Sequence, residues 1–303
     1  MLDKLYIIGG SGFIGKNMVR CLYRHYDIYV FDKHIDTAYF FQYPDVKLYP
    51  IELAIEKIPT TIETPDYIIN LASIVTAERD LSLFEPMIQA NLKVLLNLFD
   101  RFNGEKKLKL FVQFGSCEEY GDAPSPYTEN LQEQPNSPYA LVKLLTTRTA
   151  IMLHKNYGFP TIVVRPSNLF GPFQPKDKFI PYVISQLQKS LPLNVTPCEQ
   201  RRDFIYVDDF VWAIEQLLQK SATAVGKIIN IGSGESISLK EIIELCRDEI
   251  HSTSTVNYGA LPYRENESMD LRCDTSLLSS IIQTDYCFST RNHIINLSHL
   301  NTV

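Results

Sequence analysis

Two residues in the stretch "YALVK" are spaced for proton transfer to and from a hydroxyl group. Tyr139 and Lys143 are four positions apart, so a helix would place both side chains on one face. A lysine ammonium beside a phenol favours the phenolate and is expected to lower the pKa of the tyrosine. Such a tyrosine can exchange a proton with a substrate hydroxyl while a nicotinamide carries the hydride. Because this spacing is also common on ordinary helix surfaces, the interpretation depends on the neighbouring motifs.

The stretch "FVQFGSCEEYG" adds polar residues at the end of a buried strand. It presents Ser116, Cys117 and Glu118 at the carboxyl end, where open α/β sheets bind their ligands. We expect the Ser116 hydroxyl to bind and position the reacting oxygen. A serine that only caps the strand end or a helix is the alternative, and the Tyr139–Lys143 pair favours the catalytic interpretation.

The stretch "LYIIGGSGFIG" near the start predicts a dinucleotide site. A strand-like run comes before the glycines and a helix-like run follows them, which is the context that this fingerprint requires. The glycines allow a tight turn, a close approach of pyrophosphate and close packing of the helix, whose free N–H groups meet the phosphate charge. The residues expected to contact the cofactor here are Gly9, Gly12, Phe13, Ile14 and Gly15.

The next strand-like run, "IYVFD", ends in Asp32. A carboxylate at this point accepts hydrogen bonds from the ribose 2′- and 3′-hydroxyls of adenosine and repels a 2′-phosphate. Asp32 therefore favours NAD over NADP as the cofactor, although Lys33 and His34 directly after it soften that preference.

Two more stretches are candidates for the same cofactor site. Leu71, Ala72 and Ser73 follow the apolar run "YIIN" and are small enough to let a cofactor lie across the strand end. Asn91 lies in the helix-like stretch "IQANLKVLLNLF", where it is either a cofactor-side residue or a solvent-facing or capping amide.

These residues need a scaffold, and the pattern of the first half predicts one. Apolar runs such as "TIVV" alternate with amphipathic stretches such as "MIQANLKVLLNLFDRF". Strands that alternate with helices predict a parallel sheet covered on both faces, so the fold class is α/β with a doubly wound Rossmann sheet. After Arg165 the prolines become frequent, which indicates a smaller carboxyl-terminal substrate-binding domain. We expect a cofactor domain over residues 1–171 and a substrate domain mainly over 172–303, with some segments that cross back.

Composition excludes several classes of protein. The chain has 303 residues, 45% of them hydrophobic, and a formal net charge of −6. An acidic chain lacks the positive surface that nucleic-acid or membrane partners require, so an anionic ligand must be held by a few placed cations. Six scattered cysteines without metal-ligand spacing are expected to be free thiols rather than a metal site. The start of the chain has no apolar signal-peptide stretch, and we expect a cytoplasmic location.

Taken together, these motifs resemble the extended short-chain dehydrogenases/reductases, specifically the nucleotide-sugar epimerase/dehydratase group. The resemblance covers roughly Leu5 to Leu278 and includes "GGSGFIG", "FGSCEEYGD", "YALVK", "RPSNLFGP", "RRDFIYVDD" and "INIGSGESIS" in this order. It implies a nucleoside-diphosphate sugar as substrate and Ser116, Tyr139 and Lys143 as the catalytic triad. We also expect a homodimer.

The resemblance assigns further residues by position. Pro166 is similar to the residue whose backbone meets the nicotinamide amide, and Asn168 to a contact of the substrate diphosphate. Arg202 and Arg264 resemble arginines that pair with the sugar-nucleotide phosphates, as an acidic chain requires.

Two stretches depart from the family pattern. Leu53 occupies the adenine-side position, but it follows Glu52 where many relatives have aspartate. The carboxyl terminus "FSTRNHIINLSHLNTV" is short and lacks the usual signature of a final helix.

The resemblance leaves the reaction open among several chemistries at the sugar C4. Glu118 stands where 4,6-dehydratases carry a glutamate base, but Cys117 replaces the neighbouring aspartic acid of some of those enzymes. Carboxylates at this place also occur in reductases of 4-keto-6-deoxy sugars, whereas Asp32 favours an epimerase that recycles bound NAD. A 4-epimerase is the preferred hypothesis, a 4-ketoreductase the second and a dehydratase or decarboxylase the third. A regulator without catalysis is disfavoured because Ser116, Tyr139 and Lys143 are all present.

Overall fold

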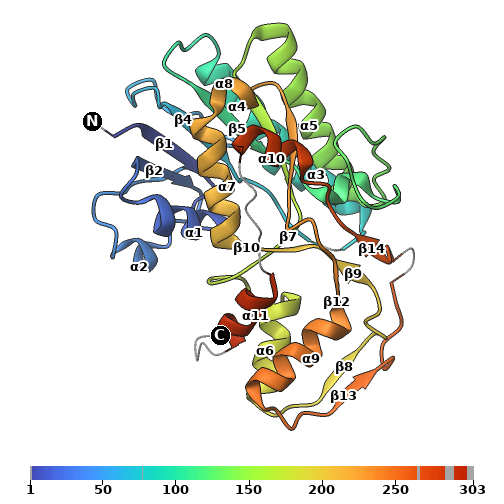
Figure 1. Ribbon diagram of the computed structural model, residues 1–303. Coiled ribbons are helices and arrows are strands. Elements are labelled where there is room, and N and C mark those ends of the chain that lie inside the picture. The colour runs from blue at the N-terminus through green and yellow to red at the C-terminus, as the bar shows by residue number, and fades with distance from the viewer. Residues whose placement is uncertain (1, 77, 265–266, 284–289, 299–303) are drawn as a thin grey trace.

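A parallel seven-stranded sheet forms the centre of the larger lobe (Figure 1). In the computed structural model, which describes residues 2–76, 78–264, 267–283 and 290–298, its strand order is β11-β6-β5-β4-β1-β2-β3. The strands are β1 (Lys4–Ile8), β2 (Asp27–Asp32), β3 (Lys47–Pro50), β4 (Tyr67–Asn70), β5 (Leu110–Phe114), β6 (Thr161–Pro166) and β11 (Ile228–Ile231). All neighbouring strands of this sheet run parallel.

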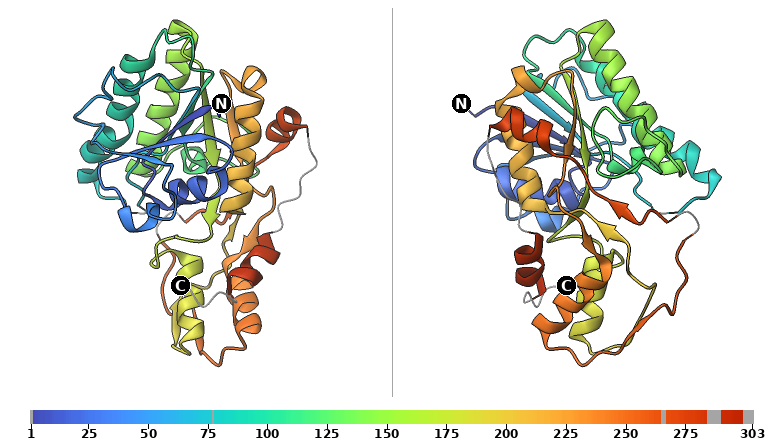
Figure 2. Two further views of the ribbon diagram at one scale, coloured as in Figure 1. Left: turned by 90° about the vertical axis from the view of Figure 1, so that its left-hand side faces the viewer. Right: turned by 45° about the vertical axis from the view of Figure 1, so that its right-hand side comes forward.

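Helices cover both faces of the sheet, as the left view of Figure 2 shows. They are α1 (Phe13–Leu22), α4 (Val94–Phe102), α5 (Pro138–Tyr157), α7 (Val207–Gln219) and α10 (Ser276–Ile282). Because side chains of a strand alternate between the two faces, Leu5 and Ile7 pack with α1, α7 and α10. Tyr6 and Ile8 pack with α4 and α5 in a second core. The predicted doubly wound α/β fold is therefore confirmed.

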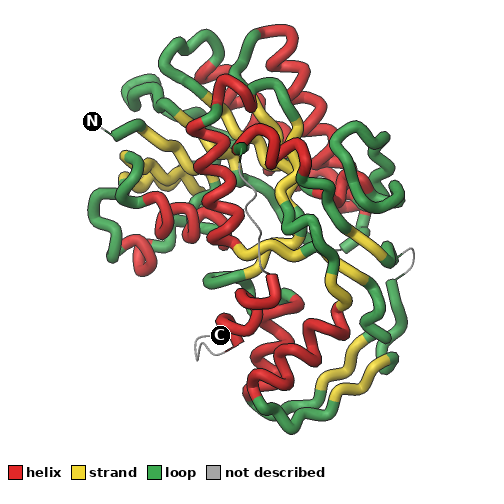
Figure 3. The backbone as a smooth tube through the Cα atoms, viewed as in Figure 1, coloured by secondary structure: helices red, strands yellow, loops and turns green. Residues whose placement is uncertain are grey.

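A smaller lobe lies next to the carboxyl ends of the strands (Figures 1 and 3). It contains α6 (Phe179–Gln188), β8 (Leu193–Val195), α9 (Leu239–Ile250), β13 (Val256–Tyr258) and α11 (Thr290–Ser298). Apolar side chains of α6 and α9, among them Ile184 and Ile243, form its core.

The chain passes between the lobes several times after β6. Strand β7 (Asn168–Phe170) pairs with β10 (Phe204–Tyr206), and β9 (Arg201–Arg202) lies between β12 (Ile237–Ser238) and β14 (Asp270–Leu271). Helix α7 and strand β11 belong to the larger lobe, so residues beyond 172 contribute to both lobes. The division at residues 171 and 172 stays a prediction.

The carboxyl-terminal stretch corrects one expectation. Although the sequence lacks the family's final-helix signature, residues Thr290–Ser298 form helix α11. Ile294 and Leu297 are three positions apart and both are buried in the core of the smaller lobe. His293 adds an ion pair with Asp209 and stacks on Tyr206. Two buried apolar residues are too few to give a clear helical pattern in the sequence.

Short helices fill the remaining connections. They are α2 (Thr37–Phe40), α3 (Phe84–Ile88), α8 (Ser221–Ala224), the 3-10 turns η1 (Leu81–Leu83) and η3 (Cys117–Tyr120), and the π-helical turn η2 (Gln89–Lys93). Within the described ranges, no helix combines the length and the apolar character needed to cross a membrane.

Candidate active site

A cavity of about 1330 Å³ lies along the carboxyl ends of the sheet strands and reaches the smaller lobe. Its wall includes Ile8, Asp32 and Phe114 at the ends of β1, β2 and β5, and Asn194 and Leu239 from the smaller lobe. Pockets for one small ligand usually measure about 300–1,000 Å³. This cavity is therefore large enough for a dinucleotide together with a second ligand.

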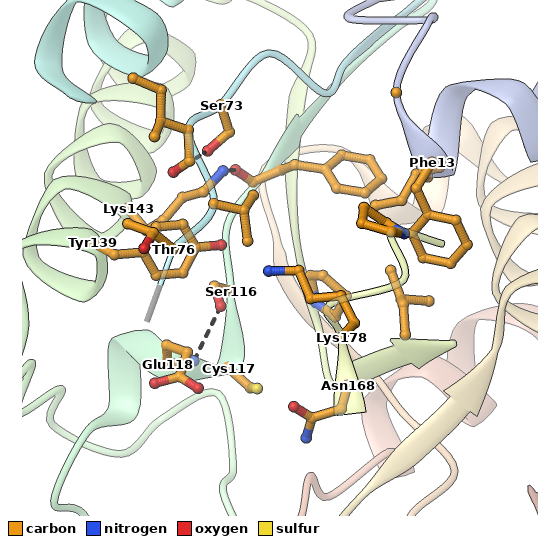
Figure 4. A pocket seen from close by; sticks show the side chains of 18 of the residues that line it. Phe13, Ser73, Thr76, Ser116, Cys117, Glu118, Tyr139, Lys143, Asn168 and Lys178 are labelled. Atoms are coloured by element: carbon orange, nitrogen blue, oxygen red, sulfur yellow. Dashed lines mark hydrogen bonds between the residues drawn. The ribbon is translucent and has the colours of Figure 1, made fainter. Parts of the chain in front are cut away.

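The cavity brings together all the predicted site residues except Asn91. Those on its wall are Gly9, Gly12, Phe13, Ile14, Gly15, Asp32, Leu53, Leu71, Ala72, Ser73, Ser116, Glu118, Tyr139, Lys143, Pro166, Asn168, Arg202 and Arg264. Several of them are labelled in Figure 4.

Asn91 is placed elsewhere. It is 1% exposed, and its amide nitrogen donates a hydrogen bond to the carbonyl oxygen of Met87 at 2.9 Å. It lies in the π-helical turn η2 and, among the described residues, is not part of the cavity wall. The alternative of a solvent-facing amide is excluded as well, because the side chain is buried.

The glycine turn fits a dinucleotide on structural grounds. A Cβ atom on Gly15 would lie 2.4 Å from the Cα atom of Gly10, so only glycine allows this tight approach. A Cβ atom on Gly12 would meet only the carbonyl oxygen of Gly9, because this side of the turn opens to the cavity. Helix α1 begins directly after Gly12 without a side-chain cap, so its N-terminus is available to an anion.

Asp32 is held in a fixed orientation at the end of β2. Its two carboxylate oxygens accept hydrogen bonds from the backbone N–H groups of Ser11, at 3.0 Å, and His34, at 3.1 Å. Each oxygen can accept a further bond, since a carboxylate has about four acceptor positions. The carboxylate can therefore also bind two ribose hydroxyls.

Helix α5 places Tyr139 and Lys143 on the cavity wall. Its first turn is capped by Ser137, whose hydroxyl oxygen accepts a hydrogen bond from the Ala140 N–H at 3.1 Å. Tyr139 lies in this turn and Lys143 one turn later. The Lys143 amine donates a hydrogen bond to the carbonyl oxygen of Phe114 at 3.0 Å and lies 5.9 Å from the centroid of the Tyr139 ring.

The charges around this pair differ from the expectation. Burial raises the pKa of Tyr139, and the Glu118 charge adds to this, while a hydrogen bond with Ser116 opposes it. In the protein alone the pKa of Tyr139 is therefore raised and not lowered as expected, because the loss of water around the phenol dominates. Burial also lowers the pKa of Lys143 to about 8, and the Glu119 carboxylate opposes that change.

Ser116 is a cap in the structure and also lies on the cavity wall, so its predicted catalytic role stays a prediction. It caps the 3-10 turn η3, and its hydroxyl oxygen accepts a hydrogen bond from the Glu118 N–H at 3.2 Å. The same hydroxyl faces the cavity, as Figure 4 shows, and it interacts with Tyr139 there.

Glu118 lies on the cavity wall, and the charged groups around it are three arginines and Glu267. The protein walls around it raise its pKa by desolvation, and Arg202, Arg264 and Arg79 oppose this with their positive charges. Arg202 also forms an ion pair with Glu267, which lies on the same wall. This part of the cavity combines three arginines with two carboxylates, and the excess positive charge can attract an anion.

Sequence reasoning missed several charged residues of the cavity, among them Arg79, Lys178 and Glu267. The Lys178 side chain reaches toward the cavity in Figure 4 and precedes α6 directly. The only sequence feature that could have pointed to Lys178 is its position directly before the helical stretch "FIPYVISQLQ". Arg79 and Glu267 are in loops without a periodic pattern, so nothing in the sequence distinguished them from surface charges.

Known proteins share both the sequence pattern and the fold of this chain. Residues 5–232 match the NAD-dependent epimerase/dehydratase family. The chain is 37% identical to CDP-abequose synthase of Salmonella muenchen over 120 residues, which are 40% of this chain and 41% of that relative. It is 29% identical to dTDP-glucose 4,6-dehydratase of Haemophilus influenzae over 272 residues, or 80% of this chain and 78% of the relative.

Among solved structures, UDP-glucuronic acid 4-epimerase from Bacillus cereus, in complex with UDP-glucuronic acid and NAD, has the same fold. The TM-score is 0.89 at 23% identity, over 97% of this chain and 98% of the other. NAD supplies a hydride acceptor and donor when bound, and the glycine turn and Asp32 are the residues that would hold it. Since the family match spans most of the sequence and the cavity fits a dinucleotide, the chain belongs to the NAD-dependent epimerase/dehydratase family.

Proposed function

We propose that this enzyme is a nucleotide-sugar 4-epimerase, which inverts the configuration at C4 of a nucleoside-diphosphate hexose. One observation carries the proposal. Ser116, Tyr139 and Lys143 face the same cavity as the glycine turn, and that cavity continues to the arginine cluster. A proton-transfer group, a dinucleotide site and an anion site therefore meet at one place.

The residues act as follows in this proposal. Tyr139 takes the proton of the C4 hydroxyl while the hydride leaves C4, which gives a 4-keto sugar, and returns the proton when hydride comes back to the opposite face. Ser116 donates a hydrogen bond to the same oxygen. Lys143, fixed by its bond to the Phe114 carbonyl, provides positive charge that stabilises the phenolate of Tyr139.

Arg202 and Arg264 bind the diphosphate in this proposal. Both lie on the cavity wall, and guanidinium groups bind phosphate oxygens in a bidentate way. Asn168 contributes a third polar side chain, whose amide nitrogen already donates to the Asp203 carbonyl oxygen at 3.0 Å and is thereby oriented.

Cys117 favours epimerisation over dehydration. Loss of water from C5 and C6 needs one group that removes the C5 proton and another that protonates the leaving hydroxyl. Glu118 could be the first group, but Cys117 beside it is a buried thiol with weak donor character. A 4,6-dehydratase is nevertheless a candidate because Glu118 faces the cavity, and the 29% identical relative is a dehydratase.

A 4-ketoreductase would use the same serine, tyrosine and lysine. It differs in that each turnover consumes reduced cofactor from solution, whereas an epimerase regenerates the NAD that it holds. Asp32 disfavours the phosphorylated cofactor that biosynthetic reductases usually take.

We also propose a homodimer in a reducing, cytoplasmic compartment. Leu141, Leu145 and Met152 are 40–45% exposed on one side of α5, at spacings that form an apolar stripe. A second copy could cover this stripe through a twofold axis. Five cysteines of the described ranges are free thiols, which suits a reducing compartment, while Cys287 lies outside those ranges. Light scattering at several protein concentrations would test the dimer, and a monomer at every concentration would contradict it.

A substrate panel tests the proposed function. Purified enzyme is incubated with UDP-, GDP-, CDP- and dTDP-hexoses, and products are identified by NMR. We expect a C4 epimer from one nucleotide class, without net change in the absorbance of reduced nicotinamide. Conversion that requires added reduced cofactor in equal amount would support the ketoreductase instead, and no conversion of any sugar would contradict all three enzyme hypotheses.

A further inference from the structure

A buried ion pair lies directly behind the candidate catalytic turn. Glu119 and Arg165 are both 0% exposed. One Glu119 carboxylate oxygen accepts a hydrogen bond from the Arg165 Nε–H at 2.9 Å and lies 2.7 Å from a second guanidinium nitrogen in the ion pair. The guanidinium also donates to Glu133 at 2.7 Å and lies 4.5 Å from the centroid of the Tyr120 ring.

The other carboxylate oxygen of Glu119 joins two parts of the active site. It accepts a hydrogen bond from the backbone N–H of Ser116 at 2.9 Å and another from the Thr147 hydroxyl at 2.9 Å. Ser116 starts the catalytic turn, and Thr147 lies one helical turn beyond Lys143 on α5. One carboxylate therefore fixes the distance between the turn that carries Ser116 and the helix that carries Tyr139 and Lys143.

Two neighbouring residues show that this arrangement is tight. A Cβ atom on Gly115 would lie 2.4 Å from the same oxygen of Glu119, so no side chain fits between the strand end and the carboxylate. Arg165 comes directly before Pro166, which lies on the cavity wall. The ion pair therefore joins β6, which carries Arg165, to the turn through the Ser116 N–H and to α5 through the Thr147 hydroxyl.

A buried ion pair adds little to the stability of the folded state, because the cost of removing both charges from water cancels most of their attraction. What such a pair does provide is a single geometry, since each departure leaves a buried charge without its partner. Catalysis needs such a geometry, because a displacement of about 1 Å between reacting groups can reduce the rate roughly 100-fold.

We propose that Glu119 and Arg165, with the Thr147 hydroxyl, are positioning residues that hold Ser116 at the correct distance from Tyr139. The proposal rests on the function given above, because it takes Ser116 and Tyr139 as the groups that bind and deprotonate the substrate hydroxyl. Glu119 and Arg165 themselves do not touch the substrate.

The neighbouring threonines of α5 allow a matched test. Thr147→Val removes the hydroxyl that binds Glu119 and keeps the shape of the side chain. Thr146→Val is the control, because Thr146 is equally buried but its hydroxyl donates only to the Val142 carbonyl oxygen of the same helix. We expect Thr147→Val to lower kcat about tenfold with little change in KM, whereas Thr146→Val leaves kcat within about twofold. Thr147→Ser, which restores the hydroxyl, should recover most of the loss.

Glu119→Gln tests the charge, and we expect it to lower kcat at least as much as Thr147→Val does. Since this variant could unfold, amide hydrogen exchange of residues 116–120 gives a measurement that does not depend on turnover. We expect faster exchange there in Thr147→Val and no change in Thr146→Val. Equal kcat and equal exchange in the two valine variants would overturn the positioning role. An inactive wild-type enzyme would instead contradict the proposed function, and the exchange experiment would still decide the positioning role.

Discussion

The Lys143 amine lies 5.9 Å from the centroid of the Tyr139 ring, on the same face of helix α5. Its hydrogen bond to the Phe114 carbonyl anchors the lysine to the end of β5, so the pair cannot separate without loss of that bond. Sheet and helix thus fix an amine close to a phenol on the wall of the cavity that also includes the glycine turn.

Tyr139→Phe removes the proton-transfer group and leaves the shape of the cavity unchanged. We expect turnover to fall roughly 100-fold or more, as for a positioned acid or base, while NAD binding stays the same. Steady-state kinetics and calorimetry with NAD check the two parts. A variant that keeps turnover close to that of the wild type would show that another group transfers the proton.

The lowered pKa of Lys143 predicts that the free energy of unfolding of the protein changes with pH. Its pKa in the folded protein is about 8 instead of the ordinary 10.5, because burial disfavours the charged amine. Below pH 8 both states carry the proton and the cost of burying the charge is complete. Between pH 8 and 10.5 the folded state loses the proton first, so this cost disappears as the pH rises. Urea unfolding should therefore show wild type gaining stability relative to Lys143→Met across that range, and parallel pH curves would contradict the assignment.

Asp32 should set the preference for the cofactor, because its carboxylate binds ribose hydroxyls and repels a 2′-phosphate. We expect Asp32→Ala to weaken NAD binding more than NADP binding in calorimetry. Asp27→Ala is a control at the opposite end of β2, where Asp27 pairs with Lys47 and does not line the cavity. Tighter binding of NADP than of NAD by the wild type would show that the assignment is wrong.

Arg202 and Arg201 allow a test of diphosphate binding with adjacent residues. Arg202 lines the cavity, whereas Arg201 is exposed and pairs with Glu241. Loss of a charged hydrogen-bond donor costs about 2–3 kcal/mol, so Arg202→Ala and Arg264→Ala should each raise KM about 30-fold or more. Arg201→Ala should leave KM unchanged. Unchanged KM in either cavity variant removes that arginine from the diphosphate site.

The elements that could be predicted from the sequence are those with a clear local pattern of apolar residues and glycines. The run "LYII" became β1 because both of its faces are buried, and the glycine turn followed it directly. Strand β3 gave no comparable signal, because Lys47–Pro50 is short and partly exposed at the sheet edge. Local patterns could not find the Arg165–Glu119 pair either, because its hydrogen bonds join segments far apart in the chain. The helical pattern around Asn91 did not indicate the π-helical turn in which this residue is buried.

The fate of the C5 hydrogen tests the proposed epimerisation most directly. Dehydration must break the C5–H bond, with Glu118 as the base, whereas epimerisation at C4 leaves that bond intact. The reaction is run in D₂O with wild type and with Glu118→Gln, and the product is examined by NMR after any exchange in the substrate alone has been subtracted. We expect a C4 epimer without deuterium at C5 and only a modest effect of Glu118→Gln. Deuterium at C5 of a dehydrated product, lost together with activity in the glutamine variant, would contradict the proposed epimerisation.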